Sequence, residues 1–255
     1  MTQMSRVNRR RFLAAAAASS LLGGCDRLSE APWFVRLLGR AEGVNLRVQR
    51  LLASRGALAP EYTAAELSPS FKSNGTSDPE DPQYQAQARN GFADWRLEIG
   101  GLVERPTRFS LAELRQLPAR TQITRHDCVE GWSCIGKWKG VPLGHLLEIV
   151  GPRPEARYLA FFCADALDSD SPDKYYETID FNDAYHPQTI LAYEMNDQTL
   201  PIPHGAPLRL RVERQLGYKM AKYVMRVELV GSFAHLGGGS GGYWEDRGYA
   251  WYAGI

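Results

Sequence analysis

A cysteine occupies an unusual setting in the stretch RHDCVEGWSCIGKWKG, residues 125–140. A structural cysteine prefers apolar neighbours, but the residues that flank Cys128 are charged or form hydrogen bonds: Arg125, His126, Asp127 and Glu130. Nearby cations can hold a thiol as the thiolate, the form that binds metals or acts as a nucleophile. The segment therefore indicates that Cys128 has a chemical role.

A second group of reactive side chains follows in HGAPLRLRVERQLGYKMAKYV, residues 204–224. Among the basic side chains of this turn–strand–turn stretch, four are candidates for binding a ligand: His204, Arg209, Lys219 and Lys222. Glycines such as Gly217 allow the backbone to approach a ligand closely. Cations beside accessible backbone suit a phosphate group. Because a basic strand face is usually solvated, this segment alone does not establish a site.

Helical signals place these residues in a larger fold. Residues 33–55 have apolar side chains at helical spacing and an arginine-rich opposite face, so we expect a helix that packs on its own domain or, alternatively, rests on a membrane surface. Ser110 and Glu113 form a capping box, and Pro118 ends the short helix that it starts. A further short helix is predicted over residues 141–151.

Strand patterns are more numerous than helical ones. They cover residues 95–103, 156–165, 189–196, 206–214 and 222–230. Residues 68–91 are polar and predict a long functional loop, and the glycine-rich turn at 235–244 lacks the lysine of a P-loop. Without a βαβ rhythm or G-x-G-x-x-G, the pattern predicts an α+β fold of mixed β-sheets with short helices.

Charge excludes one class of partner. After residue 24 the chain has 26 basic and 29 acidic residues, a balance that gives no indication of nucleic-acid binding.

The N-terminus predicts export. Arg9 and Arg10 precede a short apolar run that is too short to span a bilayer, as in a twin-arginine signal peptide over residues 1–24. The letters LLGGC resemble a lipobox, which would make Cys25 a lipidated residue; an ordinary export signal with an incidental cysteine is the alternative. We expect a periplasmic protein held at a membrane by lipid. Residues 25–67 would form an anchor and helix, and residues 68–255 the main domain.

Three cysteines remain after Cys25, so at least one thiol has no internal disulfide partner. No C-x-x-C pair is present, which disfavours a zinc ribbon or a thioredoxin-like site. We interpret Cys134 as a small core residue, whereas Cys163 could belong to the core or line a cofactor.

Taken together, the motifs D-C-V-E-G-W-S, H-P-Q-T-I-L-A-Y, H-G-A-P-L-R and G-Y-K-M-A-K resemble the sulfite oxidase superfamily of molybdenum–pterin enzymes, from about Phe71 onward. This resemblance implies a molybdopterin-binding fold, with Cys128 as the catalytic ligand to molybdenum. It favours the mononucleotide form of the cofactor. The candidate cofactor-binding residues are Asn74, Arg125, His126, Cys163, His204, Arg209, Gly217, Lys219, Met220, Ala221 and Lys222.

Within that superfamily, the residues after Cys128 differ from the C-A-G-N-R-R of sulfite oxidases and are similar to the C-V-E-A-W-S of periplasmic protein-methionine-sulfoxide reductases. His204 and Cys163 replace the Asn and Thr of those reductases. The C-terminal aromatic residues are expected to pack as a flap, with a pocket wall as the alternative.

The resemblance implies an exported enzyme that transfers an oxygen atom to or from a small-molecule or side-chain substrate, with electrons exchanged through a separate haem protein or cytochrome. Sulfite oxidation, a non-catalytic binding protein on the same fold, and a thiol enzyme with Cys128 as nucleophile are the alternatives.

Overall fold

The computed structural model describes residues 31–52, 56–168 and 173–255. The chain divides into two compact units, residues 1–52 and 53–255, each of which is described by itself. The predicted signal peptide and Cys25 lie outside the described residues. Among the helices that the structure describes, none is long and apolar enough to cross a membrane.

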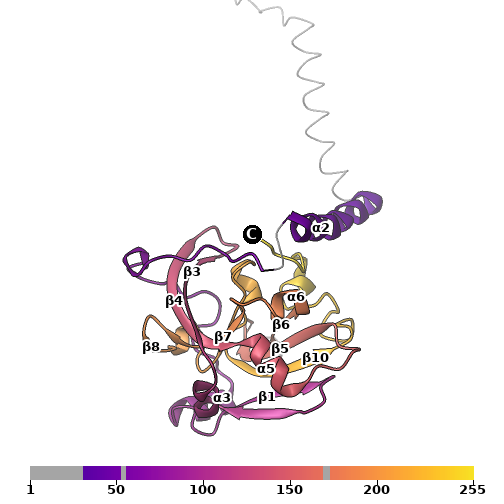
Figure 1. Ribbon diagram of the computed structural model, residues 1–255. Coiled ribbons are helices and arrows are strands. Elements are labelled where there is room, and N and C mark those ends of the chain that lie inside the picture. The colour runs from indigo at the N-terminus through magenta and orange to yellow at the C-terminus, as the bar shows by residue number, and fades with distance from the viewer. Residues whose placement is uncertain (1–30, 53–55, 169–172) are drawn as a thin grey trace, which may run out of the picture. The chain divides into compact units, whose positions relative to one another are not determined.

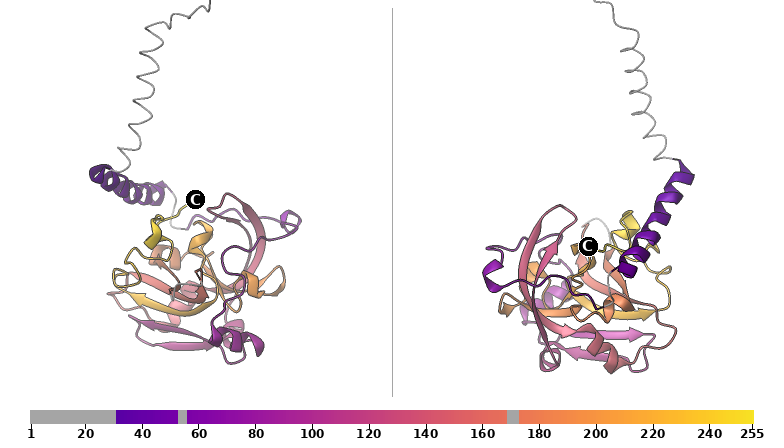
Figure 2. Two further views of the ribbon diagram at one scale, coloured as in Figure 1. Left: turned by 180° about the vertical axis from the view of Figure 1, so that it is seen from behind. Right: turned by 45° about the horizontal axis from the view of Figure 1, so that its top comes forward.

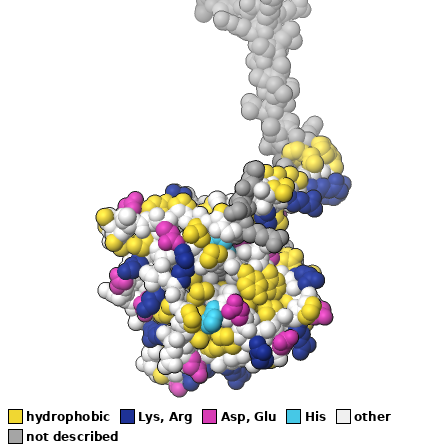
Figure 3. Space-filling model, in the orientation of Figure 1, with side chains coloured by type: hydrophobic (Ala, Val, Ile, Leu, Met, Phe, Trp, Pro, Cys, Tyr) yellow, Lys and Arg dark blue, Asp and Glu magenta, His cyan; other side chains and the backbone are white. Residues whose placement is uncertain are grey.

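In the first unit the described part is one helix, α2 (Pro32–Leu52), which confirms the helix predicted over residues 33–55. Its sequence joins apolar and arginine-rich faces, and both kinds of side chain are visible on its surface (Figure 3).

The second unit contains two β-sheets. The first has the strand order β2-β1-β10-β5-β6 and is mixed, because β1 and β10 run parallel whereas its other pairs are antiparallel. Its strands are β1 (Arg96–Gly101), β2 (Thr107–Ser110), β5 (Tyr158–Ala166), β6 (Lys174–Asp180) and β10 (Val224–Val230).

The second sheet is antiparallel, with the order β3-β4-β7-β8 and with β9 also paired to β7. Its strands are β3 (Arg120–Asp127), β4 (Ser133–Pro142), β7 (Ile190–Met195), β8 (Gln198–Thr199) and β9 (Arg209–Arg211). The hairpin of β3 and β4 is long and curved (Figure 1 and Figure 2).

Short helices connect the strands, as expected of an α+β fold. The α-helices are α3 (Pro82–Arg89), α4 (Leu111–Gln116), α5 (Leu143–Val150) and α6 (Phe181–Ala184); the 3₁₀ turns are η1 (Ala64–Glu66), η2 (Ile202–His204), η3 (Gly217–Lys219) and η4 (Glu245–Arg247). The predicted capping box is present at α4, where the Glu113 backbone N–H donates to Ser110 Oγ at 3.1 Å. The predictions of α4 and α5 are confirmed.

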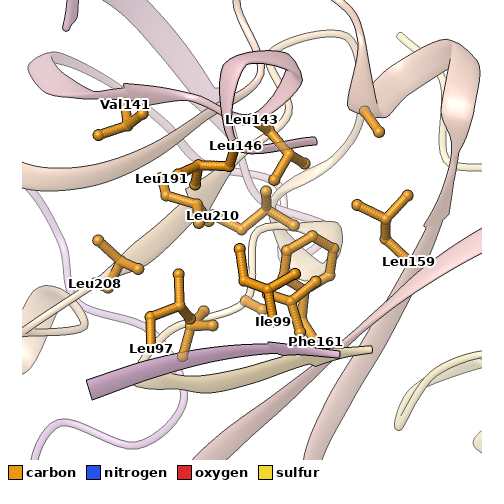
Figure 4. Close-up of a cluster of buried hydrophobic side chains, with 14 of the residues drawn as sticks. Leu97, Ile99, Val141, Leu143, Leu146, Leu159, Phe161, Leu191, Leu208 and Leu210 are labelled. Atoms are coloured by element: carbon orange, nitrogen blue, oxygen red, sulfur yellow. The ribbon is translucent and has the colours of Figure 1, made fainter. Parts of the chain in front are cut away.

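The main apolar core lies between the two sheets (Figure 4). Leu97 and Phe161 come from the first sheet, and Leu191 and Leu210 come from the second. As the alternation of residues 208–213 predicts, Leu210 of β9 and Leu208 just before it enter this core. Arg209 and Arg211 point to the other side of the strand, but both are buried as well. The opposite side of β9 is therefore an interior polar layer, not a solvated face.

Two expectations need correction. Residues 68–91 are not one loop, because α3 begins at Pro82: Asp81 caps the helix by accepting from the Tyr84 N–H at 2.8 Å, and the Tyr84 side chain is fully buried. Strands β3, β4 and β6 were not predicted. The buried face of β3 consists of Gln122, Thr124 and His126, so its alternation carries no hydrophobic signal.

Candidate active site

Cys128 lies in the hairpin turn between β3 and β4. Its backbone N–H donates to the Trp132 carbonyl at 2.9 Å, and its own carbonyl accepts from the Gly131 N–H at 3.0 Å. Gly131 has a φ of +85°, which glycine adopts without strain. The turn thereby fixes the Cys128 side chain, which is only 7% exposed, toward a cavity of about 140 Å³.

Segments far apart in the sequence form this cavity. Besides Cys128, the lining includes Asn74 and Thr76 from the loop before α3, Asp165 from β5, Arg209 from β9, Gly217, Met220 and Lys222 from the stretch before β10, and Trp244 and Tyr249 from the C-terminal segment. Six of the candidates proposed from sequence therefore meet here: Asn74, Cys128, Arg209, Gly217, Met220 and Lys222.

Arg209 is a buried cation that the described part of the chain does not neutralise. Its guanidinium donates to the His204 carbonyl at 3.2 Å and lies 5.3 Å from the Trp138 ring centroid, while its Nε is buried without a hydrogen-bond partner. Burial, and then the neighbouring Arg211 charge, lower the pKa of Arg209 to about 9. An anion in the cavity would accept a hydrogen bond from Arg209 and offset the cost of its buried charge.

Arg211, two residues further along β9, shows the opposite arrangement. Glu213 accepts from Arg211 Nε at 2.9 Å and from its terminal nitrogen at 2.6 Å. This bidentate pair is fully buried and complete within the chain. Only Arg209 of the two lines the cavity.

Lys222 is the second cation at the cavity. Its ammonium group donates to the carbonyls of Asn74 at 2.7 Å, Pro203 at 3.2 Å and Thr76. Carbonyls carry only partial charge, and burial followed by the Arg209 charge lowers the pKa of Lys222 to about 7. The cavity therefore presents two buried cations whose protonated forms an anionic ligand would stabilise.

These residues fit an anionic cofactor that itself supplies most of the ligands to its metal ion. Among the described residues no group of three or more His, Cys, Asp or Glu side chains could hold a metal ion. The cavity instead offers one sulfur donor, from Cys128, beside the basic pair Arg209 and Lys222. A thiolate suits a soft metal and the basic pair suits a phosphate, as a molybdenum–pterin group requires.

Gly217 is required for a reason that the sequence did not show. A Cβ at this position would lie 2.3 Å from Cε1 of His126, so any larger residue would displace the histidine ring. His126 is fully buried; its Nδ1 lies 3.1 Å from an Arg211 nitrogen and 3.3 Å from Met220 Sδ. It therefore supports the cavity wall from behind and does not line the cavity.

The hypothesis that Arg125 and His126 hold Cys128 as a thiolate is wrong for this structure. Arg125 is half-exposed and pairs with Asp127 at 2.9 Å, and burial keeps the pKa of His126 well below its usual value, so that ring is neutral. Burial also raises the pKa of Cys128. The free side chain is accordingly a thiol, and a metal ion would have to displace its proton.

Other candidates lie outside the cavity lining. Lys219 is buried between Glu177 at 2.5 Å and Glu245 at 2.6 Å, so its ammonium is already neutralised. Cys163 is buried in the core and borders a different cavity of about 1220 Å³. His204 does not line the cavity, although its carbonyl accepts from Arg209, and Ala221 is buried in the core. Their roles toward a cofactor stay predictions.

Several lining residues were not singled out from the sequence. Asp165 ends the predicted strand 156–165, but one carboxylate at a strand end carries no distinctive signal. Thr76 lies in the loop that was expected to be functional. Trp244 and Tyr249 stack with ring centroids 5.2 Å apart, so the C-terminal aromatics form a pocket wall in addition to packing on one another.

The chain matches the family described as "Oxidoreductase molybdopterin binding domain" over residues 83–234, more than half of its length. The chain belongs to this family, and it is a molybdopterin-dependent oxidoreductase with the α+β fold predicted from its sequence. The sequence-based assignment to the sulfite oxidase superfamily is confirmed.

Its relatives define the resemblance more narrowly. A protein of Azospira oryzae, named provisionally as a protein-methionine-sulfoxide reductase subunit YedZ1, is 39% identical over 92% of this chain and 82% of its own length. The protein-methionine-sulfoxide reductase catalytic subunit MsrP of Ralstonia nicotianae is 31% identical over 87% of this chain and 68% of its own length.

Other similarities are shorter. MsrP of Gluconobacter oxydans is 37% identical over 59% of this chain, which spans about half (51%) of that relative. The crystal structure of the sulfane dehydrogenase SoxCD from Paracoccus pantotrophus matches with a TM-score of 0.49 and 26% identity, over 55% of this chain and 39% of that one.

Proposed function

We propose that the protein is an exported molybdenum–pterin enzyme that reduces sulfoxides, with methionine sulfoxide side chains of proteins as the substrate class. The names of its relatives in Ralstonia and Gluconobacter support this direction of reaction. The V-E-G-W-S sequence after Cys128 supports it as well, because sulfite oxidases differ there. The observation that carries the proposal is the meeting of the Cys128 thiol with the buried cations Arg209 and Lys222 in one cavity.

The reaction breaks the S–O bond of the sulfoxide. Two electrons and two protons are consumed, the sulfur is released as a thioether, and the oxygen leaves as water. When bound, the molybdenum–pterin group supplies a two-electron centre that can accept an oxygen atom. A separate haem protein or cytochrome would deliver the electrons.

The chain's own residues would bind the cofactor and position the substrate side chain. Cys128 Sγ would be the protein ligand to the metal, and Arg209 and Lys222 would hold the phosphate. Trp244 and Tyr249 provide an aromatic wall against which the apolar part of a methionine side chain could lie. Asp165 borders the same cavity, and burial raises its pKa to about 6, so its carboxyl can hold a proton near neutral pH.

The burial of Cys128 also separates this mechanism from a thiol enzyme. A nucleophilic cysteine needs a lowered pKa, whereas burial raises the pKa of Cys128 despite a backbone hydrogen bond from Glu130 that acts in the opposite direction. The thiol therefore suits metal binding better than free nucleophilic attack.

The proposal also covers location and cofactor form. We infer that residues 1–24 direct export by the twin-arginine route to the periplasm, that Cys25 carries lipid, and that the cofactor is the mononucleotide. Arg9→Lys together with Arg10→Lys should leave the protein in the cytoplasm, and Cys25→Ala should abolish the incorporation of a radiolabelled fatty acid into the protein. Unchanged fractionation of the arginine variant, or labelling that persists in Cys25→Ala, would contradict the corresponding part.

One assay tests the catalytic proposal. Purified protein would be analysed for molybdenum and pterin, then given a reduced dye as electron donor with methionine sulfoxide, an N-oxide or a sulfoxide-containing oxidised protein. In parallel it would be given sulfite with an oxidised dye. We expect molybdenum at about one atom per chain and turnover of the sulfoxides. Sulfite oxidation without sulfoxide reduction would overturn the proposed direction, and a metal-free protein with full activity would overturn the proposed chemistry.

A further inference from the structure

The helix α2 has a row of exposed apolar side chains beside a row of arginines, although apolar side chains also occur elsewhere on it, among them Val35, which is 51% exposed. At 100° per residue, Trp33, Leu37, Val44, Val48 and Leu51 fall within a sector of about 60°. These apolar side chains are between 45 and 83% exposed. They form a continuous stripe along the helix, which we call the apolar stripe.

Arginines border this stripe along one edge. Arg36, Arg40, Arg47 and Arg50 fall within a neighbouring sector of about 80°, and Glu42 is the helix's one acidic residue, on a different side. We call these four residues the arginine edge. Figure 3 shows yellow apolar and dark blue basic side chains on separate parts of the helix surface.

The apolar stripe and the arginine edge lie side by side, and this arrangement distinguishes between the partners that could bind α2. Two copies of α2 paired through their apolar stripes would offer the arginine edges no acidic partner, because Glu42 lies on a different side of the helix. In an antiparallel pair the two arginine edges would also lie close together, and like charges at that spacing repel. A bilayer surface satisfies both stripes at once, since apolar side chains enter the boundary of the acyl chains and adjoining guanidinium groups reach the phosphates of the headgroups. Trp33 at the start of the stripe has the amphipathic ring that favours this boundary.

We propose that α2 binds flat on the surface of a membrane that contains anionic lipid, through its apolar stripe and arginine edge. The helix is about 32 Å long at 1.5 Å per residue, so it would contact lipid along its whole length. Its arginines would add electrostatic attraction to anionic headgroups. This contact is independent of any lipid on Cys25 and does not rest on the proposed catalytic function.

Vesicle co-sedimentation tests the inference. The full chain carrying Cys25→Ala, so that no lipid is attached, would be mixed with two kinds of vesicle. One consists of phosphatidylcholine alone, and the other contains about 30% phosphatidylglycerol as the anionic lipid. We expect binding to the anionic vesicles that is at least about a hundredfold tighter than to the neutral ones.

Three variants in this background separate the contributions. Arg36→Gln, Arg40→Gln and Arg47→Gln together should weaken binding to anionic vesicles by about a hundredfold, at about fivefold per arginine, and leave the weak binding to neutral vesicles unchanged. Leu37→Glu with Val44→Glu should abolish binding to both. The matched control replaces three exposed arginines of the second unit, Arg105, Arg108 and Arg153, with glutamine: net charge changes equally, but binding should persist.

Each other occupant predicts a different result. If α2 packs on its own domain or on a second copy of the chain, the arginine triple variant and the parent will bind vesicles equally. Packing on a second copy will also show a dimer by light scattering. Either result overturns the inference. Equal loss in the control triple variant would overturn it too, because attraction would then follow net charge and not α2. Far-ultraviolet circular dichroism would establish that every variant remains folded.

Discussion

Lys219 and Lys222 are three residues apart and both are buried, yet the chain treats them differently. Lys219 lies between two carboxylates, Glu177 and Glu245, whereas Lys222 is held by the carbonyls of Asn74, Pro203 and Thr76. The physical effect is visible in the pKa values. The two carboxylates raise the pKa of Lys219 against the cost of burial, while that of Lys222 falls to about 7.

The same division separates Arg211, with its carboxylate Glu213, from Arg209, whose Nε has no hydrogen-bond partner. In both pairs the residue that borders the cavity is the one that forms no ion pair with a carboxylate among the described residues. A buried charge without a counter-charge costs several kcal/mol, so its persistence indicates a ligand of opposite charge. Charge neutralisation inside the chain thus distinguishes the residues that build the fold from those that bind.

Lys219 also has a structural consequence for the cavity. Its carboxylate partner Glu245 belongs to η4, next to Trp244, and Lys219 itself ends η3, which begins at cavity residue Gly217. The ion pairs of Lys219 therefore hold η4, which follows the cavity residue Trp244, against η3, which contains the cavity residue Gly217. A residue expected to bind the cofactor instead holds two parts of the site together.

The largest expected effect is on Cys128, which lies with the ligand-binding residues. Cys128→Ser keeps nearly the same volume, so the fold should persist. A hydroxyl is a harder and far less acidic donor than a thiol, so sulfoxide reduction should fall to background and the thiolate-to-molybdenum absorption of the oxidised enzyme should disappear. Activity assays and visible absorption spectra would measure this.

Cys134→Ser is the matched control. Cys134 is half-buried on β4, its sulfur lies 3.8 Å from the Ser70 carbonyl, and it does not border the cavity. We expect this variant to keep both the absorption band and the activity. If Cys128→Ser also kept both, the ligand assignment would be wrong.

Lys219→Met and Lys222→Met test the comparison directly. Removal of Lys219 leaves two buried carboxylates without their cation and should lower the free energy of unfolding by about 3–5 kcal/mol. Removal of Lys222 leaves three carbonyls without a donor and removes a charge near Asp165, but it breaks no ion pair, so it should cost the cofactor-free protein less, below about 2 kcal/mol. Urea unfolding of the cofactor-free proteins measures both, and equal losses would remove the distinction between the two lysines.

Asp165 gives a pH-dependent test on the binding side. Burial raises its pKa from 3.8 to about 6, although the Lys222 charge acts in the opposite direction. Because the folded-state pKa is the higher one, the stability linked to this group is fully present below pH 3.8 and is lost as pH rises through about 6. A shift of about two units corresponds to about 3 kcal/mol.

Asp165→Asn cannot ionise, so it should gain up to about 3 kcal/mol of stability over the wild type at pH 8 and almost nothing at pH 4. Urea unfolding of the cofactor-free protein at the two pH values would show the difference. A gain that is the same at both pH values would mean that ionisation of Asp165 is not its cause.

Much of the architecture could be predicted, because it depends on local patterns. The capping box of α4 and the alternating apolar residues of β9 are written in consecutive letters, and both occur as expected. Strand β3 could not be recognised in this way. Its buried residues are polar, and they are satisfied by partners distant in sequence, as when Gln122 donates to Glu213 at 2.8 Å.

The site shows the same limit. The positions of Cys128, Arg209 and Lys222 followed from motifs, but which cations lack a carboxylate depends on contacts between distant segments. Glu177 and Glu245 lie 42 and 26 residues from Lys219, and no local pattern connects them. Likewise, Arg125 is adjacent to the motif but points to Asp127, because strand alternation directs it away from the buried face that holds His126.

A further expected effect concerns cofactor retention at Arg209. Arg209→Ala removes a charge-assisted contact with the phosphate that is worth about 1.5–3 kcal/mol, or roughly ten- to a hundredfold in retention. Arg209→Lys keeps the charge but loses the planar fork, so it should retain an intermediate amount. Molybdenum and pterin would be measured after extensive dialysis, beside Arg105→Ala as an exposed control. Full retention in Arg209→Ala would show that the lone buried guanidinium does not hold the phosphate, and the contrast with Arg211 would then need another cause.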